Sequence, residues 1–130
     1  VMDLVRARPD LTIYGEVYGQ VQDLKYGVKS GCRIAVFDAW SYDHARWLDD
    51  AVLEILLAEH GVTRVPVLYR GPFSDALVRQ CATGKSTMPG ADHVREGCVV
   101  RPVVERTDMT VLSGGRVQLK IINDAYLERA

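Results

Sequence analysis

The chain has 130 residues, of which 48% are hydrophobic and 25% charged, and its formal net charge is -1. These values are typical of one globular domain and exclude a disordered tail, a coiled coil and a collagen-like repeat. No apolar run approaches the roughly 18 residues that span a bilayer, so no membrane partner is expected. Sixteen basic and seventeen acidic residues neither favour nor exclude a nucleic-acid partner, since a local basic patch can exist on a neutral chain.

Three cysteines, Cys32, Cys81 and Cys98, are odd in number and widely spaced, which argues against a disulfide framework. This pattern indicates a reducing compartment, and we expect a cytoplasmic protein. Neither a Cys-x-x-Cys pair nor a helical histidine pair is present, so the ligand spacing of a structural zinc site is missing.

The first predicted strand covers Leu11–Tyr18, where apolar and polar residues alternate as in a half-buried strand. By this alternation Ile13 and Val17 face the core, and Glu16 faces the other way. Glycines between positions 19 and 31 predict a loop, after which β-branched residues indicate a second strand over Arg33–Ala39.

A helical period replaces the alternation from about Asp43 to His60, with an apolar stripe on one face and most acids off it. Asp43 is the expected N-cap and Gly61 the expected stop. A short strand over Val65–Tyr69 is predicted next, and then a second helix over Gly71–Ala82.

Two further strands are predicted, Arg95–Val104 and Arg116–Ile122, joined by a charged turn over Glu105–Gly115. The tail, Asp124–Arg129, is expected to form a short helix. Strands mixed with helices, without regular βαβ spacing or a glycine-rich phosphate loop, predict an α+β fold rather than a doubly wound parallel sheet. One domain is expected to cover residues 1–130.

The first polar cluster is Glu16 with Gly15 and Gly19 beside it on the first strand. A carboxylate there can accept hydrogen bonds from ribose hydroxyls, and the glycines permit close approach of a ligand to the backbone. The alternative is an ordinary solvent-facing acid, because exposed carboxylates are the rule.

The second cluster is Phe37-Asp38 on the second strand. Strict alternation puts Phe37 on one face with Arg33, where the ring can stack on a base; plain core packing is the alternative. The same alternation puts Asp38 among the aliphatic side chains of Ile34 and Val36, where a carboxylate needs a partner.

The third cluster joins Glu96, at the start of one strand, with Lys120 on the polar face of another. Such a pair can bracket a phosphate and its metal ion, because the acid holds a divalent cation or a catalytic amine and the lysine neutralises phosphoryl charge. Arg101 is a further candidate, but alternation points it away from Glu96 unless the strand bulges or ends between them. A surface ion pair is the alternative for each of these residues.

These clusters follow one another in the order of a known motif series. The segments are Ile13–Gly19, Val36–Asp38, Arg95–Arg101 and Leu119–Lys120. Together they resemble the adenylyltransferase domain of ATP-dependent RNA ligases of the phage T4 RNA ligase 2 type, within the covalent nucleotidyltransferase superfamily. The resemblance implies an ATP-grasp-like nucleotidyltransferase fold, with mainly antiparallel sheets flanked by helices and the nucleotide bound between them.

The resemblance also implies a mechanism. A lysine attacks the α-phosphate of ATP to form a lysyl-adenylate, the adenylyl group passes to an RNA 5′-phosphate, and a 3′-hydroxyl displaces AMP, with magnesium (Mg2+) assisting. Carried over by motif, Glu16 holds the ribose and Phe37 stacks on adenine. Glu96 is the acid near the lysine and the metal, and Lys120 contacts phosphate.

Two departures from the family pattern matter. The nucleophile motif, Lys-x-x-Gly or Lys-x-x-Asp, should precede the Glu16 strand, yet no lysine of the chain has Gly or Asp three positions later. We therefore expect a domain that is incomplete at its N-terminal side and cannot form the lysyl-adenylate alone. Ile122 occupies the position of the second lysine of a Lys-x-Lys motif, which weakens phosphate neutralisation or shifts it to Arg101 or Arg116.

Three alternatives stay open at this stage. The chain can be a catalytically inactive nucleotide- or RNA-binding module, in which the missing lysine is genuine. It can be a structural interaction domain, in which Glu16 and Glu96 are surface charges and Phe37 is core. It can also belong to another covalent nucleotidyltransferase, such as a DNA ligase. The motifs specify neither the kind of RNA end nor the oligomeric state.

Overall fold

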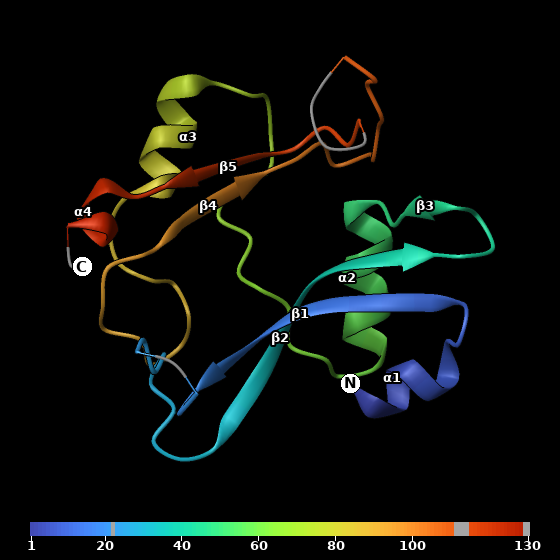
Figure 1. Cartoon of the computed structure of the whole chain (residues 1–130), viewed down its shortest axis with the longest axis horizontal. Helices are drawn as coiled ribbons and strands as arrows, with labels where there is room; N and C mark the ends of the chain where they lie inside the picture. The colour runs from blue at the N-terminus through green and yellow to red at the C-terminus, as the bar shows by residue number, and fades with distance from the viewer. Residues whose placement is uncertain (22, 111–114, 129–130) are drawn as a thin grey trace.

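The computed structural model describes residues 1–21, 23–110 and 115–128, which form two antiparallel sheets and four helices (Figure 1). One sheet has the strand order β1-β2-β3, and the other pairs β4 with β5. This arrangement confirms the predicted α+β fold. The elements are α1 (Met2–Ala7), β1 (Leu11–Gly19), β2 (Cys32–Ser41), β3 (Arg46–Trp47), α2 (Asp50–Glu59), α3 (Asp75–Ala82), β4 (Gly97–Val100), β5 (Leu119–Ile122) and α4 (Asp124–Leu127).

The main hydrophobic core lies between the first sheet and the helices α1 and α2. Apolar residues of β1 and β2 contact leucines of both helices there, and Ile13 packs against them as predicted. Val17, predicted to face this core, is 47% exposed. The strand pair extends beyond α2 at that end, so α2 does not cover Val17 (Figure 1). The buried members are Leu4, Leu11, Val36, Ala39, Leu53, Leu56, Leu57 and Val62.

The register of β1 and β2 contains an irregularity at Phe37. Tyr14 lies opposite Asp38 and Gly15 lies opposite Val36, so Phe37 is an extra residue in β2, as in a β-bulge. Residues directly opposite one another point to the same face of a sheet, and neighbours along a strand point to opposite faces. Asp38 therefore shares a face with Tyr14 and lies on the opposite face from Val36. The predicted grouping of Asp38 with Val36 is wrong because the bulge adds one residue to the period.

Helix α2 begins later than predicted. Arg46 and Trp47 pair with Ser41 and Trp40 as β3, so the chain is still extended at the place where the helix was expected to start. The cap position is Asp49 rather than Asp43. The helix ends near the predicted stop, since the described helix runs to Glu59 and Gly61 has a positive φ of 59°.

Helix α3 also starts later than predicted. Ser74 accepts a hydrogen bond from the Leu77 amide at 3.3 Å and caps the helix there. The predicted strand over residues 65–69 is wrong. Only one isolated bridge forms, between Arg64 and Val36, and the Val65 amide donates to the Val36 carbonyl at 3.0 Å.

The second sheet is shorter than predicted, because β4 ends at Val100 and β5 begins at Leu119. Residues 111–114 of the predicted charged turn lie outside the described residues, as does the predicted end of the last helix, Arg129. Helix α4 over Asp124–Leu127 confirms the helical tail, and Asn123 caps it through the Ala125 amide.

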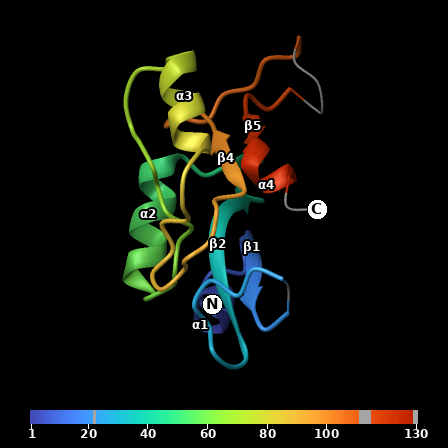
Figure 2. The same cartoon turned by 90° about the vertical axis from the view of Figure 1, so that its left-hand side faces the viewer.

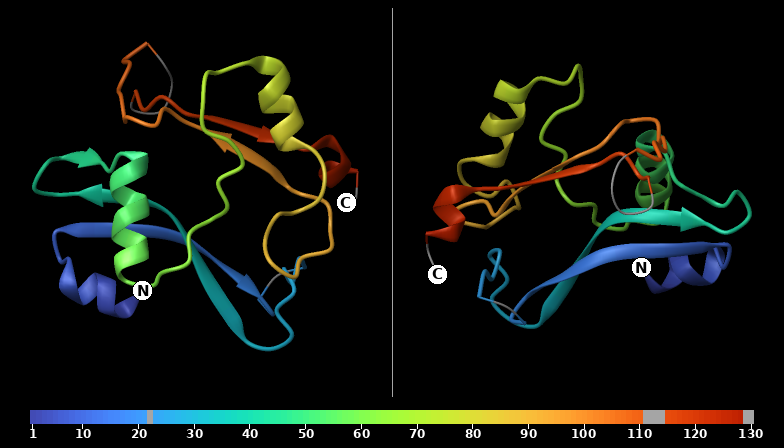
Figure 3. Two further views of the ribbon diagram at one scale, coloured as in Figure 1. Left: turned by 180° about the vertical axis from the view of Figure 1, so that it is seen from behind. Right: turned by 45° about the horizontal axis from the view of Figure 1, so that its top comes forward.

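Helix α3 covers one face of β4 and β5, and the Cys98 thiol lies 3.8 Å from the Val78 carbonyl oxygen of that helix. The opposite face carries Val99 and Lys120, which are paired across the two strands and exposed. The β4–β5 pair lies between α3 and the first sheet in two different views (Figure 2; Figure 3). Within the described part of the chain, no helix has the length and apolar character needed to cross a membrane.

Candidate functional site

Glu16 interacts electrostatically with Glu96 and with Lys120, two residues from distant parts of the chain. Glu16 is on β1, Glu96 directly precedes β4, and Lys120 is on β5. Partial burial raises the pKa of the Glu16 carboxyl, the negative charge of Glu96 raises it further, and Lys120 acts in the opposite direction. The structure therefore brings these three predicted site residues into one electrostatic environment.

Tyr26 also belongs to this cluster, although no motif in the sequence singles it out. It lies in the loop between β1 and β2, and its hydroxyl donates to Glu96 Oε1 at 2.5 Å. Burial and this hydrogen bond raise the pKa of Tyr26 well above its ordinary value, so the phenol keeps its proton and acts as the donor. A tyrosine in a glycine-containing loop has no sequence signal that would mark it as a site residue.

Phe37 is the extra residue at the bulge, and its side chain is 40% exposed. The exposure contradicts the alternative of plain core packing. Glu16 lies opposite Ala35, so the ring and the carboxylate are held by the same strand pair, close in register. Stacking of Phe37 on adenine stays a prediction.

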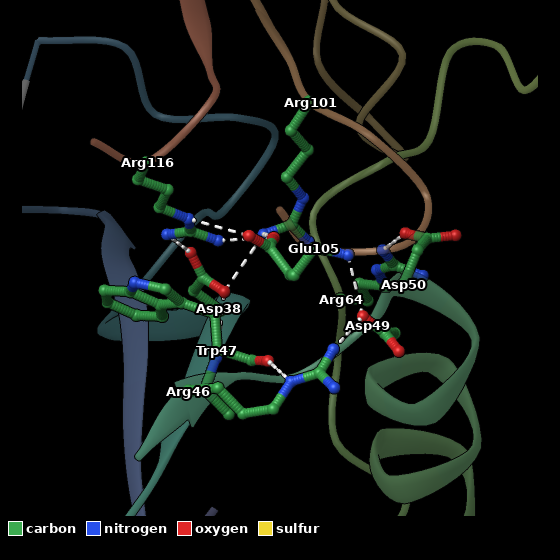
Figure 4. Close-up of polar contacts among 10 residues, drawn as sticks. Asp38, Arg46, Trp47, Asp49, Asp50, Arg64, Arg101, Glu105 and Arg116 are labelled. Carbon is green, nitrogen blue, oxygen red and sulfur yellow. Dashed lines mark hydrogen bonds and ion pairs between the residues drawn. The ribbon is translucent and has the colours of Figure 1, made fainter. Parts of the chain in front are cut away.

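Asp38 has the partners that its burial requires. Its Oδ1 lies 3.0 Å from Arg101 Nη1, and its Oδ2 accepts from Arg116 Nη1 at 2.6 Å. Arg116 also donates to both oxygens of Glu105, at 2.7 and 3.1 Å, and its guanidinium carbon lies 3.9 Å from the Trp47 ring centroid. We call Asp38, Arg101, Glu105 and Arg116 the ion-pair cluster (Figure 4).

The ion-pair cluster gives Arg101 a carboxylate partner where the sequence predicted a phosphate. The Arg101 side chain is only 16% exposed and is held by Asp38. Contact of Arg101 with nucleotide phosphate stays a prediction. Arg116 was the other residue expected to neutralise phosphate in place of the missing second lysine. It is held in the same ion-pair cluster.

The ion-pair cluster connects the two sheets. Asp38 belongs to β2, Arg101 directly follows β4, and Arg116 lies three residues before β5. The Glu105 amide also donates to Asp49 Oδ1, at the start of α2, at 2.7 Å (Figure 4). These contacts hold the end of the β4–β5 pair that carries Arg101 and Arg116 against the first sheet, which also carries Glu16.

The carboxylates of the site fit a divalent cation that a nucleotide helps to hold. Among the described residues no group of three His, Cys, Asp or Glu side chains gathers as in an all-protein metal site. Mg2+ commonly takes one or two carboxylates and fills its remaining positions with water and substrate phosphates. Glu16 and Glu96 repel one another, and a cation bound near them would reduce that repulsion.

Two hollows of the described structure share Pro66 as a lining residue. One has a volume of about 280 Å³ and is lined by Tyr18, Tyr26, Arg33 and Arg64, among other residues, so Tyr26 forms part of its wall. A wider one of about 600 Å³ lies between residues 66–69 and α3. Tyr26 links the smaller hollow to Glu96, because it lines that hollow and its hydroxyl binds Glu96. Neither hollow is lined by Glu16, Phe37, Glu96 or Lys120.

A family model described as RNA ligase matches residues 2–122. The chain belongs to the RNA ligase family. This confirms the family that the motif series predicted. Comparison with curated protein sequences gives no match.

Solved structures of Naegleria gruberi RNA ligase share the fold. A lysine-to-alanine variant with ATP and Mn has a TM-score of 0.74 at 21% identity, over 99% of this chain and 37% of that chain. A lysine-to-methionine variant with AMP and Mn has a TM-score of 0.75 at 21% identity, with the same coverage. This member of the RNA ligase family thus spans 37% of the length of these relatives and shares their fold.

Proposed function

We propose that this chain forms the nucleotide-binding part of an ATP-dependent RNA ligase of the T4 RNA ligase 2 type. The enzyme would join RNA 5′-phosphate and 3′-hydroxyl ends through lysyl-adenylate and RNA-adenylate intermediates. One observation carries the proposal: Glu16 interacts electrostatically with both Glu96 and Lys120 in a chain of the RNA ligase family. The N. gruberi structures with ATP or AMP and Mn support it, because that protein shares the fold.

Each side chain has a role that its chemistry allows. Glu16 accepts hydrogen bonds from the ribose hydroxyls, and Phe37 offers an exposed ring face to the adenine. Lys120 projects from β5 and neutralises phosphate charge, and Glu96 holds one side of a divalent cation, which we expect to be Mg2+. When bound, the cation supplies positive charge that stabilises the phosphates during transfer. Arg101 supports this site by holding Asp38, at 3.0 Å.

The nucleophile is the one part of the mechanism that these 130 residues do not supply. None of the four lysines begins a Lys-x-x-Gly or Lys-x-x-Asp motif. We therefore expect the 130-residue chain to bind ATP without becoming adenylylated. Incubation with labelled ATP and Mg2+, followed by a denaturing gel, tests this, and a covalently labelled band would show that another residue acts as nucleophile.

The nucleotide site is tested by calorimetric titration with ATP and Mg2+. Glu16→Ala, Glu96→Ala and Lys120→Ala are each expected to weaken binding by about tenfold, because each removes a charged contact worth roughly 1.5–3 kcal/mol. Glu59→Ala, at an exposed acid in the last turn of α2, is the matched control. Unchanged binding in all three site variants would contradict the proposal and favour a structural role.

A catalytically inactive nucleotide- or RNA-binding module is the second candidate, and the missing lysine motif is the observation that favours it. The coding sequence upstream of Val1 separates the two. An in-frame Lys-x-x-Gly within a few tens of codons supports the ligase, and its absence supports the inactive module. The three cysteines, all free in the structure, support action in the cytoplasm for either candidate.

A further inference from the structure

The loop that carries Tyr26 is locked against a second loop. Tyr26 has a positive φ of 48°, and its ring lies edge-on to His93 with centroids 4.5 Å apart. A Cβ added at Gly27 would lie 2.4 Å from the carbonyl oxygen of Gly90, so the two backbones are in close contact there. These contacts hold Tyr26 in place on both sides of its backbone.

The Tyr26 hydroxyl is the polar end of an otherwise apolar and aromatic contact. The ring also meets Tyr18 edge-on, with centroids 5.8 Å apart, beside the small apolar cluster of Tyr18, Val28 and Ala35. The hydroxyl reaches out of this cluster to Glu96 Oε1 at 2.5 Å. A rigid ring with a fixed donor therefore contacts the carboxylate that the proposed function assigns to the metal.

An isolated glutamate carboxylate rotates readily about its last side-chain bond, because that torsion is broad and roughly twofold. A hydrogen bond from a fixed donor selects one orientation and directs the carboxylate toward its ligand. Glu96 has such a donor in Tyr26, and Glu16 and Lys120 interact electrostatically in the same cluster.

We propose that Tyr26 is a positioning residue that orients the Glu96 carboxylate for the divalent cation bound with ATP. The inference rests on the proposed function, because it presupposes that Glu96 meets this cation. Tyr26 touches neither the nucleotide nor the reacting atoms in this role. It acts through Glu96, by occupying one oxygen and thereby setting the direction of the carboxylate.

The test is Mn2+ binding to the 130-residue chain in the presence of ATP, followed by the electron paramagnetic resonance signal of free Mn2+. Tyr26→Phe keeps the ring contacts with His93 and Tyr18 and removes only the hydroxyl. We expect it to weaken Mn2+ binding by about 10-fold, the lower end of the range for a lost partner of a metal ligand. Binding of ATP without metal should be unchanged.

Tyr69→Phe is the matched control, since it removes a hydroxyl that makes an exposed hydrogen bond of 3.3 Å to the Pro72 carbonyl. Glu96→Gln provides a second route that keeps an acceptor for Tyr26. In the double variant Tyr26→Phe with Glu96→Gln, Mn2+ binding should be no weaker than in Glu96→Gln alone, because both act through one carboxylate.

The outcomes separate the two proposals. If the unaltered chain binds Mn2+ with ATP and Tyr26→Phe binds it equally well, the positioning role of Tyr26 is overturned and the proposed function stands. The role is also overturned if the effects of Tyr26→Phe and Glu96→Gln are additive. If the unaltered chain binds neither ATP alone nor Mn2+ in the presence of ATP, the proposed function itself fails.

Discussion

Arg116 Nη1 donates to Asp38 Oδ2 at 2.6 Å, across 78 positions of the sequence. This contact joins the strand that carries Phe37 to the segment that leads into Lys120. The two halves of the candidate site are thus connected by largely buried charges, in addition to the contacts of Tyr26 with His93 and Glu96. Such a connection is sensitive to the loss of Asp38, since two largely buried arginines then share Glu105 alone within the ion-pair cluster.

Asp38→Ala should therefore destabilise the fold strongly. It leaves Arg101 and Arg116 with Glu105 as their one remaining carboxylate in the ion-pair cluster, so we expect a cost near the lower end of the about 3–5 kcal/mol typical of a broken buried pair. The free energy of unfolding in urea measures the change. Asp3→Ala is the control, because its 3.5 Å pair with Arg6 is exposed, and a change below about 0.5 kcal/mol is expected. Equal effects of the two substitutions would contradict the structural role of the ion-pair cluster.

Gly97→Ala should disrupt the second sheet. Gly97 has a φ of 150°, and an added Cβ would lie 2.0 Å from the Ile121 carbonyl oxygen on the paired strand. Gly61→Ala is the comparison, because Gly61 has a milder positive φ of 59° and an added Cβ there meets nothing within 4 Å, so it should cost only about 1–2 kcal/mol. We expect Gly97→Ala to lower the thermal midpoint more than Gly61→Ala does. The reverse order would show that β4 and β5 are not paired as described.

Phe37→Ala is predicted to weaken ATP binding without loss of stability. The ring is 40% exposed, so little core packing is removed, whereas a base stacked on an aromatic ring gains about 1–3 kcal/mol. Calorimetric titration with ATP should show a decrease in affinity of about tenfold or more. Phe73→Ala, at a ring that is 62% exposed just before α3, should leave the affinity unchanged. A stability loss in Phe37→Ala equal to that of a core leucine would instead indicate packing.

Ile122→Lys tests the departure at the end of the motif series. Ile122 and Lys120 lie two residues apart on β5 and so share the face away from α3. A second lysine there should tighten ATP binding by about fivefold, as expected for roughly 1 kcal/mol from one added exposed charge pair. Leu119→Lys adds the same charge on the other face and should have a smaller effect. An equal gain in both variants would mean that the charge acts non-specifically.

The cysteines should react with thiol reagents at different rates. Burial raises the pKa of the Cys98 thiol, with Cys81 adding to the rise and Arg95 opposing it. A raised pKa lowers the fraction of reactive thiolate at neutral pH, and that fraction grows only as the pH rises above the ordinary range of a thiol. Exposed Cys32 should therefore react first at pH 7, and the rate at Cys98 should increase toward pH 10. Mass spectrometry of the labelled peptides measures both, and early labelling of Cys98 would contradict its packing against α3.

The alternating strands and the terminal helix could be predicted because each depends on a local period. Leu11–Gly19 alternates over most of its length, and Asn123 caps the helix that follows it. The start of α2 could not be predicted, since it depends on the pairing of Trp47 with Trp40 from another segment. The prediction of a strand at residues 65–69 was wrong for a related reason. Apolar residues do not form a strand without a partner strand whose edge is available.

The site could be predicted only in part. Glu16, Glu96 and Lys120 were found through their order in a motif series, and the structure brings them together. The partner of Arg101 was missed because the bulge moves Asp38 to the other face of β2, and a bulge is a property of two strands rather than of one sequence. Tyr26 was missed because its importance depends on Glu96, which is distant in sequence.

The pairing of β1 with β2 would be regular without Phe37. If that residue were removed, Val36 and Asp38 would be consecutive, just as their partners Gly15 and Tyr14 are. Phe37 thus has no partner residue in the register of β1 and β2, and its ring is exposed at the bulge. Such a defect is typical of the neighbourhood of active sites. Deletion of Phe37 should therefore keep the pairing of β1 with β2 and weaken the binding of ATP.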